Sequence, residues 1–232
     1  MTAPVAAAPS PDSTAYALER SGRLLIARFS EPHDVLSWAI VGGGIGVAEA
    51  VVWTYVRGAE LSPAIDARLW LEDTLASSGL TGAVGFLTSR NLDRFVEAAA
   101  RSGDVSAHAV ATVGLSNALR AGDPPGPLLR PGTINILCRV DRALSPEGLL
   151  EASAIATEAK AVAVLEEGIV SRRTGKTASG TGTDCIVVAA PRRGPADPYA
   201  GKHTDVGAAI GAAVESAVRR GVRDWIEENG TR

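Results

Sequence analysis

Hydroxyl, amide and carboxylate side chains gather at the starts of two apolar runs in the second half of this 232-residue chain, at 134–140 and 185–190. Such a cluster suits the attack on, or the binding of, a polar substrate. Glycine and threonine are also ordinary loop residues, so a purely structural role is the alternative. The residues concerned are Thr133, Asn135, Thr181, Thr183 and Asp184.

The segment between the two runs predicts how these side chains are positioned. Residues 148–167 carry Ala and Leu at three- and four-residue spacing, which predicts an amphipathic helix. A loop rich in Gly and Thr, 171–183, then leads into the second apolar run. Short apolar runs bounded by turn residues predict buried strands. Residues 130–191 are therefore predicted to form one unit of strand, helix, hydroxyl-rich loop and strand.

The rest of the chain predicts loosely alternating strands and helices, with paired strands at the beginning. This pattern favours an α/β or α+β fold, a layered sandwich with a mixed sheet and packing helices. We expect a single domain over 16–232, preceded by a disordered Ala- and Pro-rich tail at 1–15. Strands are expected at 23–29, 35–41, 50–56, 80–87 and 108–115, helices at 62–77, 92–101 and 205–229, and a turn at 31–34.

Three further features are candidates for a site. Gly42, Gly43 and Gly44 follow a predicted strand without the G-x-G-x-x-G register, which favours a tight turn or a close approach to a ligand over a nucleotide loop. Asn117 follows the strand at 108–115, where its amide can donate to a developing oxyanion or close a turn. His203 precedes the last helix as a candidate acid, base or cap.

Helix caps are the default role for hydroxyls that follow a strand. Thr88 or Ser89 is accordingly expected to cap the helix at 92–101.

Composition narrows the possible partners and the compartment. The net charge of -3, with scattered arginines, disfavours nucleic acid. Cys138 and Cys185 lie in apolar runs, and no Cys/His cluster has zinc spacing, so we expect no metal site and reduced thiols in the cytoplasm. The longest apolar stretch, 38–56, is interrupted by glycines and Glu49, which argues against a membrane helix. A homo-oligomer is compatible with the sequence.

Six short stretches, in order over most of the chain, resemble the adenosylcobinamide amidohydrolase family of cobamide salvage. They are AIVGGG at 39–44, ATVGLSNA at 111–118, GTINI at 132–136, TEAK at 157–160, SGTGTD at 179–184 and YAGKHT at 199–204. The resemblance implies hydrolysis of the amide between the aminopropanol arm and the corrin ring, giving adenosylcobyric acid. It implies no cofactor of the protein's own, because the cobalt corrinoid enters as substrate.

A more distant likeness concerns mechanism. The run at 132–146 is similar to the nucleophile strand of the self-processing L-aminopeptidase/D-esterase family, in which the chain cuts itself before a hydroxyl residue and the freed amine is the base. Carried over, this makes Thr133 the nucleophile, Asn117 an oxyanion donor, and 181–184 a wall that orients the substrate amide. A Thr hydroxyl needs such a base because it is a weak nucleophile alone.

The general base stays open without self-cleavage. Asp184, Glu158 and His203 are the candidates, and direct attack by activated water is an alternative. Glu158 and Lys160 lie two residues apart on a predicted helix, so at most one of them faces a cleft. The resemblance places substrate contacts at Gly42, Gly43, Gly44, Asn135, Lys160, Thr181 and Thr183.

Overall fold

A mixed eight-stranded sheet forms the centre of the computed structural model, which describes residues 15–57, 60–62, 64–127 and 130–230. The strand order is β4-β3-β2-β10-β8-β6-β5, with β1 paired to β2, and a separate two-stranded sheet joins β7 and β9. The pairs β3–β4 and β8–β10 are parallel, and the others are antiparallel. The strands are β1 (Tyr16–Ser21), β2 (Leu24–Ser37), β3 (Gly44–Tyr55), β4 (Val84–Thr88), β5 (Val96–Ser102), β6 (Val105–Val113), β7 (Ala118–Leu119), β8 (Ile134–Val140), β9 (Gly180–Thr181) and β10 (Cys185–Pro191).

The large sheet folds over on itself along the long strand β2. Residues 24–29 of β2 pair with β1, residues 33–37 pair with β10, and the register with β3 shifts between these two parts. The two halves of the sheet then face each other, and a core cluster joins Trp53 and Phe86 of one half to Leu137 and Val187 of the other. The Trp53 indole N–H donates to the Asn135 carbonyl across this core at 3.4 Å.

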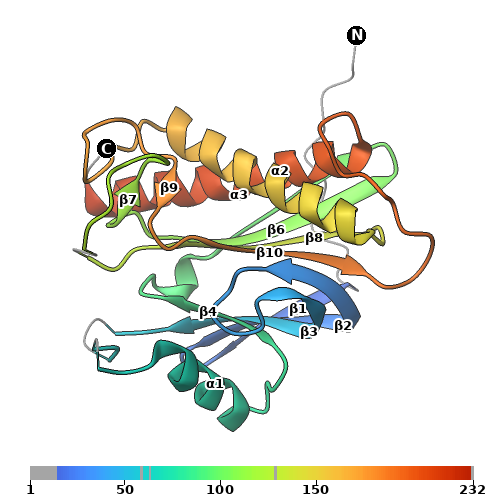
Figure 1. Ribbon diagram of the computed structural model, residues 1–232, viewed down its shortest axis with the longest axis horizontal. Coiled ribbons are helices and arrows are strands. Elements are labelled where there is room, and N and C mark those ends of the chain that lie inside the picture. Colours follow the sequence, from blue (N-terminus) through green and yellow to red (C-terminus); the bar gives the residue numbers. More distant parts are fainter. Residues whose placement is uncertain (1–14, 58–59, 63, 128–129, 231–232) are drawn as a thin grey trace.

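Helices cover the outer face of each half. Helices α2 (Pro146–Glu166) and α3 (Asp205–Asn229) lie on β6, β8 and β10, and α1 (Ala67–Ser77) lies on the half that contains β3 and β4 (Figure 1). The result is four layers, helix, sheet, sheet and helix. The predicted layered sandwich with a mixed sheet and packing helices is confirmed.

The long helices begin and end where the sequence indicates. Ser145 caps α2 by accepting from the Gly148 N–H at 3.1 Å, and Thr204 caps α3 by accepting from the Gly207 N–H at 3.0 Å. The predicted apolar stripe of α3 is buried against the sheet. Its members are Val206, Ile210, Val214 and Val218. None of the helices in the described ranges is long and apolar enough to cross a membrane.

Three local predictions are wrong. Residues 92–101 form a short 3-10 turn, η1 (Leu92–Arg94), followed by β5, because pairing with β6 overrides the helix propensity of the alanines. Asn91 caps that turn, in place of Thr88 or Ser89. The turn expected at 31–34 is part of β2, where a bulge accommodates Pro32.

Several predicted boundaries also move. The strands expected at 23–29 and 35–41 form one strand, β2, which ends at Ser37, and those expected at 50–56 and 80–87 begin at Gly44 and Val84. Helix α1 begins later than expected because Asp66 caps it, accepting from two backbone N–H groups at 2.9 and 3.2 Å. Strand β6 begins earlier, at Val105. The tail predicted at 1–15 lies outside the described residues except for Ala15.

Candidate active site

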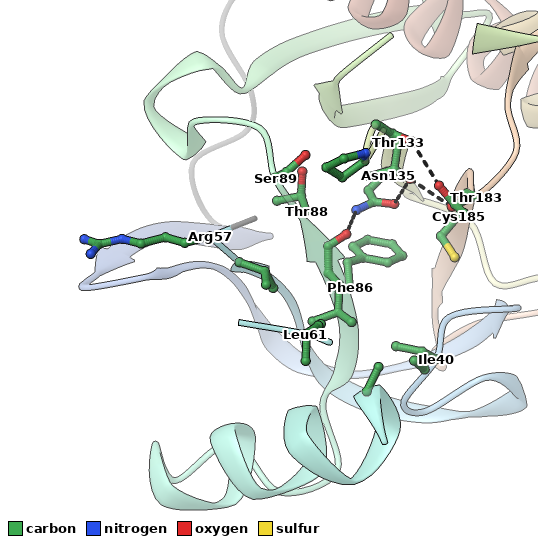
Figure 2. Close-up of a pocket in the computed structure, with 15 residues that line it drawn as sticks. Ile40, Arg57, Leu61, Phe86, Thr88, Ser89, Thr133, Asn135, Thr183 and Cys185 are labelled. Carbon is green, nitrogen blue, oxygen red and sulfur yellow. Dashed lines mark hydrogen bonds between the residues drawn. The ribbon is translucent and has the colours of Figure 1, made fainter. Parts of the chain in front are cut away.

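A cavity of about 450 Å³ opens between the two halves of the sheet, where β4 ends and β8 begins. Its wall is mostly apolar and carries a few hydroxyl and amide groups, as Figure 2 shows. This combination, together with the cavity's size, is typical of a small-molecule site. The polar lining residues are Arg57, Thr88, Ser89, Thr133, Asn135 and Thr183, with Cys185 beside them.

Thr133 lies at the mouth of β8 with only 7% of its surface exposed. Its Oγ1 lies 2.8 Å from the Thr183 carbonyl oxygen and 3.1 Å from Asn135 Oδ1. Asn135 is itself held, because its Nδ2 donates to the Leu87 carbonyl at 2.8 Å. Both contacts of Thr133 are acceptors, so its single proton points to one of them and its oxygen lone pairs are left for the cavity.

Backbone crowding explains the glycine before Thr133. A Cβ at Gly132 would lie 2.8 Å from the Asn117 backbone nitrogen and 3.0 Å from that of Ser116. The Gly132 carbonyl oxygen also accepts from Thr183 Oγ1 at 3.0 Å. The segment that leads into β8 is therefore held by backbone contact on one side and by a hydrogen bond from Thr183 on the other.

Asp184 is the centre of a buried polar cluster behind this strand mouth. Its Oδ1 accepts from the Ile134 N–H at 3.0 Å and from Thr181 Oγ1 at 2.5 Å, and its Oδ2 accepts from the Thr181 N–H at 3.0 Å. Lys160 of α2 completes the cluster with Nζ 2.6 Å from Oδ2, the two side chains being 11% and 6% exposed. Four donors thus occupy one carboxylate.

This cluster and Thr133 lie on opposite faces of the sheet. Successive side chains along a strand alternate between faces, and Cys185 and Asn135 are paired neighbours that both line the cavity. Asp184, one residue earlier, faces α2 and Lys160, and neither is among the described residues that line the cavity. Their roles as base and substrate contact stay predictions, and the geometry gives them a supporting role.

The other two candidate bases lie farther from Thr133. Glu158 is exposed and pairs with Lys202 at 2.5 Å. His203 is also exposed. It lies beyond the end of β10, whereas Asp184 lies at the start of that strand, so the length of β10 separates His203 from the Asp184 end of the sheet. The structure brings neither to the cavity wall over the described residues.

Of the remaining predicted substrate contacts, some line the cavity and others do not. Asn135 and Thr183 line the cavity, whereas Thr181 belongs to the Asp184 cluster. Gly42 and Gly43 lie in the connection 38–43 between β2 and β3, and Gly44 begins β3; none of the three is among the described residues that line the cavity, so their role as substrate contacts stays a prediction. Asn117 lines a different cavity, so its role as oxyanion donor stays a prediction.

Sequence reasoning missed Thr88, Ser89 and Arg57 as parts of the cavity. Thr88 and Ser89 lie at the end of β4, and in Figure 2 they are on the side of Thr133 opposite Thr183 and Cys185. The available signal was a pair of hydroxyls directly after a predicted strand, whereas Thr133 was singled out as a hydroxyl directly before one. Capping was the competing interpretation, and Asn91 fills that role.

Cys185 lines the cavity but is a poor nucleophile. Burial, reinforced by the negative charge of Asp184, raises the pKa of its thiol to about 11. The thiolate is the reactive form, so at neutral pH on the order of one thiol in ten thousand is reactive. Cys138 is fully buried, and burial raises its pKa to about 12. The role of Thr133 as nucleophile stays a prediction, and the structure places its hydroxyl in the cavity wall.

The fold and the cavity define a layered α/β protein with a mostly apolar small-molecule site that carries a few polar groups at the mouths of two adjacent parallel strands. The chain belongs to the adenosylcobinamide amidohydrolase family, whose model matches residues 10–230. The adenosylcobinamide amidohydrolase of Halobacterium salinarum is 40% identical over 117 residues, which are 47% of this chain and 46% of that protein. The match therefore spans about half the length of the curated relative.

Two solved structures are similar to this chain at low identity. The β-aminopeptidase of a Burkholderia species has a TM-score of 0.44 and 14% identity, covering 94% of this chain and 91% of its own. The L-aminopeptidase D-Ala-esterase/amidase of Ochrobactrum anthropi has a TM-score of 0.41 and 17% identity, covering 90% and 82%. No residue role follows from likenesses of this size.

Proposed function

We propose that this protein hydrolyses the amide that joins the aminopropanol arm of adenosylcobinamide to its corrin ring, releasing aminopropanol and adenosylcobyric acid for cobamide salvage. One observation carries the proposal: the Thr133 hydroxyl lies in the wall of a cavity with its proton bonded to one of two acceptors, Asn135 Oδ1 or the Thr183 carbonyl, which leaves its oxygen lone pairs for a substrate. Membership of the amidohydrolase family over residues 10–230 supports the choice of substrate. The cobalt enters with the substrate.

Thr133 Oγ1 is the nucleophile in this proposal. It attacks the carbonyl carbon of the arm amide, the C–N bond breaks, and the departing nitrogen takes up a proton as aminopropanol leaves. Water then hydrolyses the resulting ester to the free acid and restores the hydroxyl.

Thr88 is the best placed donor to the developing oxyanion. Its Oγ1 accepts from the Arg90 N–H at 3.0 Å, and its own proton has no acceptor among the described residues. Ser89 adds a second, exposed hydroxyl to the same wall. One such donor is typically worth roughly 3 kcal/mol of the activation barrier.

The size of the cavity fits the arm better than the whole corrinoid. About 450 Å³ is the volume of a drug-sized ligand site, so the arm enters and the macrocycle stays at the mouth. Exposed apolar side chains occur on the segments that flank this mouth, among them Trp38, which is 48% exposed. The Trp38 indole is fixed by donating to the Asp184 carbonyl at 2.7 Å, which prepares a flat surface for an apolar ring.

The test is to incubate the purified protein with adenosylcobinamide and to detect aminopropanol and adenosylcobyric acid by mass spectrometry. We expect product from the wild type, a loss of at least a thousandfold in kcat with Thr133→Ala, and partial recovery with Thr133→Ser. Thr112→Val is the matched control, because Thr112 is buried opposite Asn135 on β6 and its hydroxyl has no partner among the described residues.

Each alternative predicts a different result. A folded, active Thr133→Ala variant would remove Thr133 as nucleophile and leave attack by activated water. Spectral binding of the corrinoid by the wild type without product would identify a corrinoid-binding protein instead. Turnover of amino-acid amides but not of adenosylcobinamide would identify an amidase for another substrate.

The intact mass of the purified chain addresses the general base. Two fragments that meet at the Gly132–Thr133 bond would give Thr133 a free amine that can take its proton. A single intact chain together with activity would require a base from elsewhere, or water carried in with the substrate.

A further inference from the structure

A second cavity, of about 550 Å³, lies on the other side of the segment that enters β8. It is formed by the loop after β6, the loop after α2 and the C-terminal end of α3. We call it the basic pocket, because three of its lining residues are arginines. The lining residues that matter here are Asn117, Arg130, Arg172, Arg173, Trp225 and Asn229.

Among the described residues, no carboxylate forms an ion pair with the arginines of this pocket. Arg130 and Arg172 are exposed and form no ion pair with any described residue, and the Arg173 guanidinium donates to the Pro127 carbonyl at 3.1 Å. Asp123, which holds the loop carrying two of the arginines, already accepts from Ser171 Oγ at 2.5 Å. That bond, together with donation from a backbone N–H and from a threonine hydroxyl, holds its pKa below the usual range.

The end of α3 cannot balance these arginines. A helix C-terminus carries roughly half a negative charge, against three guanidinium groups. One of its last carbonyls, that of Trp225, already accepts from Asn229 Nδ2 at 2.8 Å. The pocket therefore keeps a net positive charge, because three guanidinium groups stand against the Asp123 carboxylate and the helix end.

An amide without a partner points into the same pocket. Asn117 is only 9% exposed, and its side chain forms no hydrogen bond with any residue that the structure describes. Because Asn117 lines the pocket, its amide N–H groups are left to donate to a bound ligand. Gly182 leaves room beside it, because a Cβ there would lie 3.1 Å from Asn117 Nδ2.

We propose that the basic pocket is an anion subsite that binds a phosphate-type group through Arg130, Arg172, Arg173 and the Asn117 amide. Guanidinium forks match phosphate oxygens in pairs, and the amide N–H supplies a further donor. The residues that link this pocket to Thr133 are 130–133, so the Cα atoms of Arg130 and Thr133 are at most about 11 Å apart.

The anion has two possible sources that share this chemistry. One is a phosphate ester on the amine arm of the amide substrate, a reading that rests on the proposed function. The other is free phosphate, bound independently of the reaction. Both require the same arginines.

Isothermal titration of the full-length protein with inorganic phosphate, at low ionic strength, tests the subsite directly. We expect saturable binding that weakens at least tenfold in Arg172→Gln and in Arg130→Gln, both exposed positions where the fold should tolerate the change. Lys176→Gln is the matched control, since Lys176 is an exposed cation of the same loop that does not line the pocket among the described residues, and we expect less than a twofold change. No saturable binding, or an equal effect of Lys176→Gln, overturns the proposal.

Kinetic measurements distinguish the two sources of the anion. The Thr133→Ala variant separates this inference from the proposed function. A higher kcat/KM for a corrinoid whose aminopropanol carries a phosphate ester, lost selectively in Arg172→Gln, assigns the subsite to the substrate arm. Phosphate binding without that preference assigns it to free phosphate. Thr133→Ala should bind phosphate as the wild type does, so an inactive protein that still binds phosphate separates failure of the proposed function from failure of this inference.

Discussion

Asp184→Asn should destabilise the protein strongly, because four donors share its carboxylate. In the variant one oxygen becomes an NH2 group, which must face either the Lys160 ammonium or the pair formed by the Ile134 N–H and the Thr181 hydroxyl. Either orientation opposes donor to donor. It also leaves the charge of Lys160, whose side chain is 11% exposed, without a carboxylate. Breaking a buried pair in this way costs about 3–5 kcal/mol.

That loss corresponds to a fall in Tm of roughly 6–20 °C for a chain of this length. Urea unfolding and calorimetry of Asp184→Asn measure it, with Asp34→Asn as the matched control. Asp34 pairs with Arg192 at 3.0 Å on the surface, the side chains being 37% and 54% exposed, so its loss should cost less than about 1 kcal/mol. A free energy of unfolding for Asp184→Asn within 1 kcal/mol of wild type would refute the assignment of the cluster as the support of the strand mouths.

Two further predictions concern titratable groups. Burial lowers the pKa of His33, so the unfolded chain binds the proton more readily, and the free energy of unfolding should fall by up to about 1.4 kcal/mol per pH unit as pH drops below about 6.5. His33→Gln keeps an acceptor for Arg139 Nε, which donates to His33 Nε2 at 3.0 Å, and should show a flatter urea-unfolding profile between pH 5 and 7; identical profiles would contradict the assignment. Alkylation of Cys185 by iodoacetamide at pH 7 should be more than tenfold slower than that of free cysteine, since its pKa is about 11. Cys185→Ser should retain hydrolysis, and loss of activity in a folded Cys185→Ser would show that the thiol takes part.

Local patterns predicted the parts of this fold that depend on neighbours in the sequence. The unit of strand, helix, hydroxyl-rich loop and strand lies where the apolar runs place it, and α3 has its predicted bounds. The helix expected at 92–101 failed because β5 is stabilised by its partner β6, which begins only after a turn at 103–104. A pairing of that kind is not visible in the alanine-rich sequence itself.

The sequence predicted several residues of the candidate site but not the face of the sheet on which each one lies. Thr133, Asn135 and Thr183 line one cavity, as expected from hydroxyls and amides at two strand mouths. Asp184 follows Thr183 directly in the chain, but the pleat turns it to the opposite face. Only the parallel register, which pairs Cys185 with Asn135, decides which residue of each strand faces which side.

The alternation of side chains between the two faces of the sheet places the Thr133 hydroxyl on one face and the Asp184 cluster on the other at the mouth of β8. The Ile134 N–H, bonded to Asp184, and the Thr133 hydroxyl belong to adjacent residues, so the carboxylate fixes the backbone beside the hydroxyl while lying outside the described lining of the cavity. A charged base at the position of Asp184 would have to give up donors to act, whereas a fully bonded carboxylate holds the strand rigid. The same segment separates the cavity of Thr133 from the basic pocket, since Gly132 packs against the backbone of Asn117. A side chain at Gly132 would collide with this backbone, so the close approach of the two segments depends on that glycine.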